Sequence, residues 1–227
     1  NDTWEITKEG DEQVLKVWLS SGDDEATDDD YMDAANALEQ RIGVDIKYTE
    51  GGEDDFTLDT DSSIKTQMEG HLQCELISPV YSDYNEFTAV LEETFRAIDE
   101  LGYTNDTTGL HINIGPKDRS MDIDVLKLSI LVGDEYVGKM FDREFNTFAQ
   151  TAKEYVKRTV NREAMMDRFN PQSTEELLDM IEQYLSREEK YRSVNIGKLH
   201  RQGYLEFRIA GGEGYQNKAK QVLEMIE

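Results

Sequence analysis

Three short apolar segments of this chain carry polar side chains of the kinds that catalytic sites use. The segments are QCELISPV (73–80), GLHINIG (109–115) and LEFRIAGG (205–212). Carboxylate, imidazole, amide and guanidinium groups interrupt their apolar alternation: Glu75, His111, Asn113, Glu206 and Arg208. Carboxylates and an imidazole can bind Mg²⁺ or Mn²⁺, and a guanidinium binds phosphoryl oxygens through paired hydrogen bonds. The combination predicts a site for a metal ion and a phosphate.

Strand periodicity predicts that these polar groups share one surface. In a strand, residues two apart point to the same face. His111 and Asn113 therefore fall on the face opposite the neighbouring isoleucines. The same alternation separates Glu206, Arg208 and Glu75 from their apolar neighbours. We expect all three segments to present these groups to one concave sheet surface.

Each of these residues also has a simpler interpretation when it is taken alone. Glu206 and Arg208 could form an exposed charge pair worth well under ~1 kcal/mol. A single histidine in a strand, such as His111, is more often structural than a ligand, and Glu75 could simply face solvent. The prediction of a site therefore depends on the joint occurrence of the segments in this order.

The composition limits the partners of the protein. The chain has 227 residues, of which 49 are acidic and 24 are basic, and its net charge is -25. Nucleic acid is recognised by basic patches, so this balance argues against nucleic-acid binding through the general surface. A strongly acidic, hydrated surface suits high salt, where charge repulsion is screened. A haloarchaeal or haloviral source and an ordinary acidic protein both stay open.

The sequence predicts a soluble protein in a reducing compartment. Cys74 is the single cysteine, so no internal disulfide can form, and its apolar segment favours a buried thiol over a nucleophile. No apolar run approaches the ~20 residues of a membrane span, and no signal peptide is visible. We expect no membrane association and a location in the cytoplasm of a host cell, with the virion as the alternative. Because the chain starts at Asn1 and stops inside a helical pattern, we expect both ends to be incomplete.

The patterns of apolar residues predict an α+β fold in one domain over residues 1–227. We expect a curved, mostly antiparallel sheet with helices packed on one face. The predicted strands are 13–19, 44–48, 55–64 with a polar bend, 73–80, 109–115, 191–197 and 203–212, the last two joined by the loop KLHRQG. Helices are predicted after Asp28–Asp30 up to Gly43, over 82–102, through a helical insert at about 120–186, and from 215 onward. Ser173 is predicted to start the last helix of the insert.

Five short motifs of this chain resemble those of the amidoligases. QCELISPV resembles their E-L-(V/I)-S-P strand, and GLHINIG resembles G-L-H-x-(H/N)-(V/I)-G. YRSVN (191–195) resembles an aromatic-R-x-(V/L)-N strand, LEFRIAGG an (I/L)-E-F-R strand, and DTDSSI (59–64) a D-x-S-(I/L) turn. Amidoligases are carboxylate–amine ligases with a glutamine-synthetase-like fold and are common in phages. The resemblance covers about residues 55–227.

This resemblance implies an ATP- and Mg²⁺-dependent (or Mn²⁺-dependent) ligase. A small-molecule or peptide carboxylate would attack the γ-phosphate to form an acyl phosphate, and an amine would then displace phosphate to leave an amide. By motif position, the implied metal ligands are Glu75, His111 and Glu206. Arg208 would contact the phosphate or acyl phosphate, Arg192 and Asn195 would contact phosphate or substrate, and Asn113 and Ser62 would bind the cofactor. Asp61, beside Ser62, would contact substrate or a metal-bound water.

The chain departs from the family pattern at the expected first strand. Family members open with G-x-E-x-E, but LKVWLSS (15–21) carries no acid and IGVDIKY (42–48) has Asp45 and Lys47 instead. Asn113 also stands where a second histidine occurs. A catalytically inactive family member, serving as a structural or binding module in a virus particle, is therefore the alternative. A metal-dependent hydrolase is a third and weaker hypothesis, and the sequence leaves open a homo-oligomer or association with virion proteins.

Overall fold

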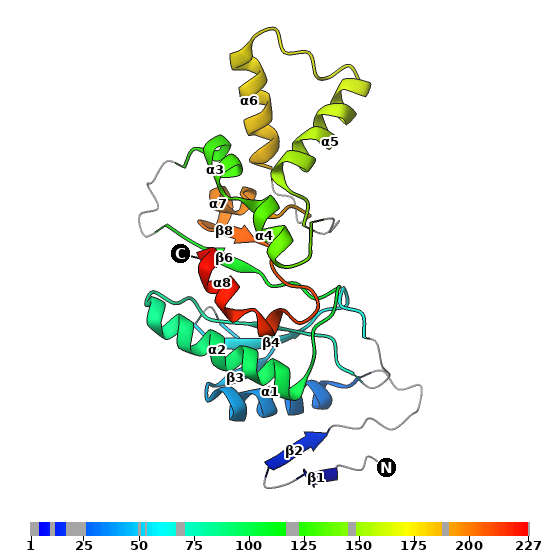
Figure 1. The fold of residues 1–227 in the computed structure, drawn as a ribbon, viewed down its shortest axis with the longest axis vertical. Helices are drawn as coiled ribbons and strands as arrows, with labels where there is room; N and C mark the ends of the chain where they lie inside the picture. The colour runs from blue at the N-terminus through cyan, green and yellow to red at the C-terminus, as the bar shows by residue number, and fades with distance from the viewer. Residues whose placement is uncertain are drawn as a thin grey trace. The chain divides into compact units, whose positions relative to one another are not determined.

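The computed structural model describes residues 5–9, 12–16, 26–49, 51–52, 54–66, 71–116, 123–144, 149–187 and 191–226 (Figure 1). The chain groups into two compact units. The first unit is Asn1–Thr107 with Gln216–Ala219, and the second is Thr108–Tyr215 with Lys220–Glu227. Helices and short strands occur in both, which confirms the α+β class. The assignment of residues 1–227 to a single domain stays a prediction.

The first unit contains two small sheets and two long helices. Its elements are β1 (Glu5–Glu9), β2 (Glu12–Lys16), α1 (Asp28–Ile42), β3 (Ile46–Tyr48), β4 (Phe56–Thr60), β5 (Cys74–Ile77) and α2 (Tyr84–Leu101). Strands β1 and β2 form an antiparallel pair. The second sheet has the order β3-β4-β5, with β3 parallel to β4 and β4 antiparallel to β5. Of the predicted strand 13–19, residues 17–19 lie outside the described residues.

Local sequence fixes both ends of α1. Asp28–Asp30 were expected to precede the helix, but they form its first turn, and Thr27 is the N-cap. The Asp30 carboxylate accepts a hydrogen bond from the Thr27 backbone N–H at 2.8 Å, which completes a capping box. Three acids in the first turn also interact favourably with the helix dipole. Gly43 ends the helix in the left-handed region, at φ 81°, as predicted.

The predicted helix over 82–102 is confirmed by α2. The Asp83 carboxylate accepts hydrogen bonds from the backbone N–H groups of Asn85 and Glu86, both at 2.9 Å, so the helix begins one residue after Asp83. Helix α1 packs against α2 and β3. The apolar sides of α1 and the β3-β4-β5 sheet form the core of this unit, whose most buried members are Ala35, Ile46, Phe56 and Leu58.

The second unit places a three-stranded sheet among helices. Its elements are β6 (Ile112–Ile114), α3 (Val125–Leu131), α4 (Asp134–Met140), α5 (Ala152–Met165), α6 (Thr174–Leu185), β7 (Val194–Asn195), α7 (Gly197–Gln202) and β8 (Leu205–Phe207). The 3-10 helix η1 (Tyr215–Asn217) and α8 (Ala219–Ile226) follow, crossing the boundary between the units. The sheet order is β6-β8-β7, and both pairings are antiparallel.

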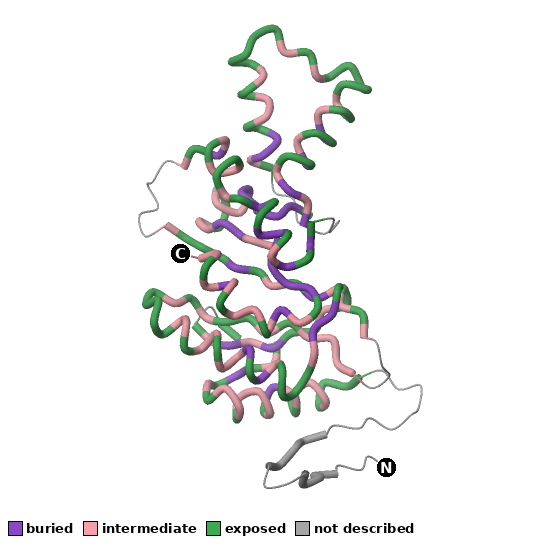
Figure 2. The backbone as a smooth tube through the Cα atoms, in the orientation of Figure 1, coloured by how far each residue is buried: buried purple, intermediate pink, exposed green. Residues whose placement is uncertain are grey.

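The predicted helical insert is confirmed by α3 to α6, although the segments 120–122 and 145–148 lie outside the described residues. Ser173 caps α6 as predicted, since its hydroxyl accepts a hydrogen bond from the Glu176 N–H at 3.1 Å. Helix α6 packs against α3 and α5. These helices and the sheet enclose a core whose most buried members are Val125, Tyr155, Tyr184, Leu185, Val194, Ile196 and Leu205 (Figure 2).

The segment KLHRQG differs from its prediction. It was expected to be a loop between two long strands, but it forms most of helix α7, which Gly203 closes at φ 82°. The reason is packing, because Leu199 lies against the core of this unit. The flanking strands shorten accordingly to β7 and β8.

The described strands are divided among three sheets rather than gathered in one curved sheet. The glutamine-synthetase-like arrangement therefore stays a prediction. Within the described ranges, none of the helices combines the length and the apolar character that a bilayer crossing requires.

Candidate functional site

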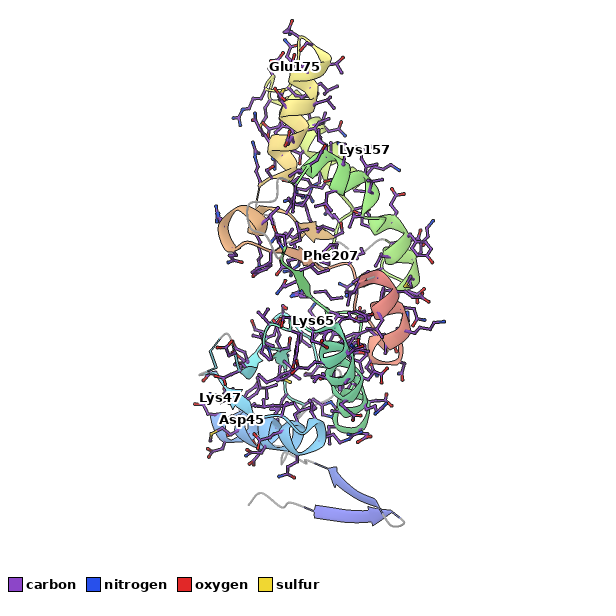
Figure 3. All side chains as sticks on the ribbon, turned by 90° about the vertical axis from the view of Figure 1, so that its left-hand side faces the viewer. Asp45, Lys47, Lys65, Lys157, Glu175 and Phe207 are labelled. Atoms are coloured by element: carbon purple, nitrogen blue, oxygen red, sulfur yellow. The ribbon has the colours of Figure 1, made fainter. Side chains whose placement is uncertain are left out.

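The centre of the candidate site is Glu206, on the middle strand of the second unit's sheet. Asn113 of β6 and Asn195 of β7 lie directly opposite Glu206 on either side, so the three side chains share one face. Phe207, labelled in Figure 3, follows on the other face of β8. Glu206 is only 3% exposed. The alternative of an exposed charge pair is therefore wrong for this residue.

Three donors neutralise the buried carboxylate of Glu206. Lys198 Nζ of α7 donates to Oε1 at 2.6 Å. Asn195 Nδ2 and Arg208 Nη1 donate to Oε2 at 3.1 and 3.2 Å. Burial alone would raise the pKa of Glu206, but these hydrogen bonds and the charges of Lys198 and Arg208 lower it overall. The carboxylate is therefore ionised at neutral pH and held by its donors.

Positive charges outnumber negative ones among the groups whose charges act on His111. Lys198, Arg208 and Arg143 contribute three cations to one carboxylate, and all four charges act on the nearby His111. Burial lowers the pKa of Lys198, but its hydrogen bond to Glu206 raises that pKa overall. Burial and the charge of Arg208 lower the pKa of Arg143, although a guanidinium stays protonated in proteins. We call the group of Lys198, Arg208, Arg143, Glu206 and His111 the cationic cluster. Its local positive charge contrasts with the net charge of -25 of the whole chain.

His111 contributes an imidazole that is neutral at physiological pH. Desolvation by the surrounding protein, followed by the charge of Arg208, lowers the pKa of His111 to about 4, while Glu206 acts in the opposite direction. The residue nevertheless remains exposed to solvent. Water therefore screens part of these charges. The ring lies beside Gly109, where an added Cβ would approach Nε2 to 3.2 Å.

Like Lys198, Arg143 is a member of the cationic cluster that the sequence patterns did not predict. It lies beyond α4, is 8% exposed, and donates from Nη1 to the Thr108 carbonyl at 2.8 Å. A glycine-rich turn begins at Gly211. In the structure its backbone lies against Arg143, because a Cβ at Gly211 would stand 2.6 Å from Nη1. No local pattern around Arg143 links it to that distant turn.

Arg192 lies in a different environment from the cluster. It is 1% exposed, and its guanidinium donates hydrogen bonds to the carbonyls of Leu185 and Arg187 at the end of α6. Its Cζ also lies 4.7 Å from the ring centroid of Tyr155 on α5. These contacts join α5 and α6 to the start of β7. Contact of Arg192 with phosphate or substrate stays a prediction.

The remaining predicted site residues belong to the first unit. Glu75 is exposed on β5 and is directly opposite Asp59 on β4. Ser62 is exposed in a turn that Asp61 stabilises, since Asp61 Oδ1 accepts from Ser63 N at 2.8 Å and from Ser63 Oγ at 2.6 Å. The second unit thus brings together His111, Asn113, Asn195, Glu206 and Arg208. The convergence of Glu75 and Ser62 with them stays a prediction.

The segment considered for the missing glutamate pair forms strand β3. Asp45 precedes this strand and Lys47 lies on it (Figure 3). Lys47 Nζ pairs with Asp55 Oδ2 at 2.7 Å, and this hydrogen bond raises the pKa of Lys47 and lowers that of Asp55. Lys47 therefore has a local structural partner in this unit.

Cys74 packs against the core of the first unit. Burial raises the pKa of its thiol. A raised pKa disfavours the thiolate. Cys74 is thus a partly buried thiol at the core, and its lack of a nucleophilic role stays a prediction.

The donor set of the cationic cluster fits an anion better than a metal ion by itself. Among the residues whose placement the structure describes, no three His, Cys, Asp or Glu side chains group closely enough to hold a metal ion. Both carboxylate oxygens of Glu206 already accept hydrogen bonds. Mg²⁺ is, however, commonly held by one or two carboxylates together with substrate phosphates. Binding of Mg²⁺ by Glu75, His111 and Glu206 therefore stays a prediction, and it applies to the protein with bound nucleotide.

The fold is α+β, and its second unit has the cationic cluster at a small antiparallel sheet. A comparison with protein-family models adds the family: residues 20–226 match the model described as "Putative amidoligase enzyme". The chain belongs to the amidoligase family, and this membership supports a ligase-type function in general. The match reaches further toward the N-terminus than the motifs did. Neither the curated proteins nor the solved structures gave a match.

Proposed function

We propose that this protein is an ATP- and Mg²⁺-dependent carboxylate–amine ligase that acts through an acyl phosphate. One observation carries the proposal: a member of the amidoligase family pairs the buried carboxylate of Glu206 with Lys198 and Arg208, and the charges of these residues and of Arg143 act together on His111. In a chain with net charge -25, such a local excess of positive charge favours a bound anion. The proposed substrates are a small-molecule or peptide carboxylate and an amine.

The proposed reaction has two steps that balance. A carboxylate oxygen of the substrate attacks the γ-phosphorus of ATP, forming an acyl phosphate and breaking the bond to ADP. The amine nitrogen then attacks the acyl carbon, forming the C–N bond as the C–O bond to phosphate breaks. The departing phosphate takes the proton that the amine loses. Such phosphoryl transfer depends mainly on positioning and on electrostatic stabilisation.

The residues of the second unit suit the electrostatic part of this chemistry. Arg208 is half-buried and bonded to Glu206 through Nη1, so its remaining donors can face a phosphoryl oxygen. Glu206 holds Arg208 and Lys198 in place. Glu75, His111 and Glu206 are the proposed metal ligands, and Mg²⁺ would neutralise phosphate charge when bound. Asn113, Asn195, Arg192 and Ser62 are proposed to contact cofactor or substrate.

Turnover with mixed substrates tests this proposal. The protein is incubated with ATP, Mg²⁺ and pools of carboxylates and amines, and ADP release and new amides are measured by mass spectrometry. We expect stoichiometric ADP and amide, and loss of both in Arg208→Gln. Arg158→Gln, which changes an exposed arginine on α5, is the control. ADP and amide formation by Arg208→Gln at the wild-type rate would sink the proposal.

A catalytically inactive member of the family is the second candidate. It is favoured by the neutralised state of Glu206, since a carboxylate that already accepts from Lys198, Asn195 and Arg208 has little acceptor capacity left for a metal ion. Such a protein would serve as a structural or binding module. Isothermal titration with ATP and Mg²⁺ separates the two candidates: the enzyme binds and Glu75→Ala and Glu206→Ala weaken binding, whereas equal heats from all three proteins favour the module.

A further inference from the structure

Arg143 has more hydrogen-bond donors than the surrounding protein uses. A guanidinium carries five N–H donors. The contacts of the described residues give Arg143 a single acceptor, the Thr108 carbonyl, which Nη1 reaches at 2.8 Å. Its Nε is buried and has no hydrogen-bond partner, and the same holds for Nε of Arg208. Buried N–H groups without an acceptor are rare and costly, so two in one cluster indicate a missing acceptor.

The guanidinium groups of Arg143 and Arg208 interact electrostatically with each other. The charge of Arg208 is the second cause, after burial, of the lowered pKa of Arg143, and both charges act on His111. Glu206 bonds to Arg208, but no ion pair joins Arg143 to a carboxylate among the described side chains. Arg143 is only 8% exposed. A positive charge that is buried to this degree without a counterion costs free energy. An anionic ligand would remove this cost.

The backbone holds Arg143 in place through a glycine pair. Gly109 and Gly211 face each other in an antiparallel bridge, and the Gly212 N–H donates to the Thr108 carbonyl at 2.9 Å. Nε2 of His111 lies against one glycine of this pair and Nη1 of Arg143 against the other. Gly211 adopts φ 114°, a conformation that side chains rarely take. The bridge therefore places the imidazole of His111 beside one of the paired glycines and the guanidinium of Arg143 beside the other.

We infer that Arg143 is a second anion-binding guanidinium beside Arg208, and that the pair takes a phosphoryl group of dianionic charge. Two guanidinium groups offer parallel N–H donors that match phosphate oxygens, and two positive charges match a dianion. The inference rests on the proposed function for the source of the phosphoryl group, namely ATP or the acyl phosphate. It adds to that function a residue outside the five motifs.

Arginine side-chain NMR tests the inference in the intact wild-type protein. Inorganic phosphate is titrated into protein with ¹⁵N-labelled arginine, with chloride adjusted to hold ionic strength constant. The Nε–Hε signals of Arg143 and Arg208, assigned by their loss in Arg143→Lys and Arg208→Lys, are expected to shift together and saturate with one dissociation constant. An Arg143 signal that stays fixed while the Arg208 signal saturates would overturn the inference, as would saturation of neither.

Variants provide a second readout. Phosphate binding is expected to weaken at least tenfold in Arg143→Lys, which keeps the charge but loses the planar donors, and to disappear in Arg143→Gln. Arg158→Gln is the matched control and is expected to bind as wild type does. If Arg143→Gln does not fold, the NMR shift and Arg143→Lys still decide the question. Wild-type affinity in Arg143→Lys would overturn the inference.

These results separate the inference from the proposed ligase function. If amides form but phosphate binding does not depend on Arg143, the ligase proposal is retained and the arginine pair is rejected. Phosphate-dependent shifts of both arginines without ADP release would support the pair and count against the ligase.

Discussion

Glu75 and Glu206 carry the same carboxylate and were predicted to have the same role, yet the two units give them opposite environments. Glu75 is exposed on β5 and faces another acid, Asp59, across the sheet. Glu206 is 3% exposed on β8 and accepts hydrogen bonds from Lys198, Asn195 and Arg208. Glu75 is thus an exposed carboxylate opposite another acid, whereas Glu206 is a buried carboxylate in contact with cations. The first unit therefore has an exposed carboxylate at its predicted site position, whereas the second has a buried carboxylate bonded to cations.

Removing each carboxylate gives the largest expected contrast. Glu206→Ala leaves Lys198 and Arg208 partly buried without their counterion, and breaking a buried pair in this way costs about 3–5 kcal/mol of unfolding free energy. Glu75→Ala changes an exposed side chain, so we expect a change within about 0.5 kcal/mol. Urea unfolding monitored by hydrogen exchange in each unit measures both. Equal losses in the two variants would contradict the contrast.

The glycine pair gives the next largest effect. Gly211→Ala forces a Cβ to within 2.6 Å of Arg143 Nη1 and of the Leu110 nitrogen, at φ 114°. We expect a loss of about 2 kcal/mol or more, since left-handed backbone alone costs ~1–2 kcal/mol for a side chain. Gly133→Ala is the control, because Gly133 also has positive φ, 67°, but nothing lies within 4 Å of an added Cβ. Thermal unfolding that is equally affected in both variants would disprove the tight packing of Arg143.

Acid should destabilise the second unit through Glu206. The pKa of Glu206 is lowered in the folded protein, so the carboxylate contributes stability above its unfolded pKa of about 4.3, and this contribution is lost as pH falls toward the folded value. The unfolding free energy of the wild type should therefore fall more steeply below that pH than the free energy of Glu206→Gln. Identical slopes for the two proteins between pH 5 and 3, in urea titrations, would show that the donors do not stabilise the anion.

The smallest expected effect is on His111. Its pKa lies below 6.5 because of desolvation and the charge of Arg208. Replacing Arg208 by Gln should raise the pKa of His111 toward 6.5, with the size limited by the exposure of the ring. NMR titration of the imidazole measures this shift, and Arg158→Gln should leave it unchanged. A lower pKa in Arg208→Gln would contradict the proximity of the two groups.

Sequence predicted the contents of the candidate site better than its surroundings. Helix α2 and the cap at Ser173 followed from strong local signals. The motifs also named Glu206, Arg208 and Asn195, which the sheet register and the hydrogen bonds to Glu206 bring together. The helix at Lys198 was missed because Leu199 is drawn into the core by tertiary packing, and with it the ion pair that neutralises Glu206. Arg143 was missed because its link to Gly211 joins residues far apart in sequence.

The most direct test of the account is equilibrium binding of a non-hydrolysable ATP analogue with Mg²⁺ to the wild type, Arg208→Gln and Arg158→Gln. The cationic cluster predicts saturable binding that weakens at least about tenfold in Arg208→Gln, because a hydrogen bond to a charged group contributes ~1.5–3 kcal/mol. Arg158→Gln should bind as the wild type does. Equal affinity of all three proteins, or weakening by Arg158→Gln alone, would contradict the assignment of this cluster as the phosphate site.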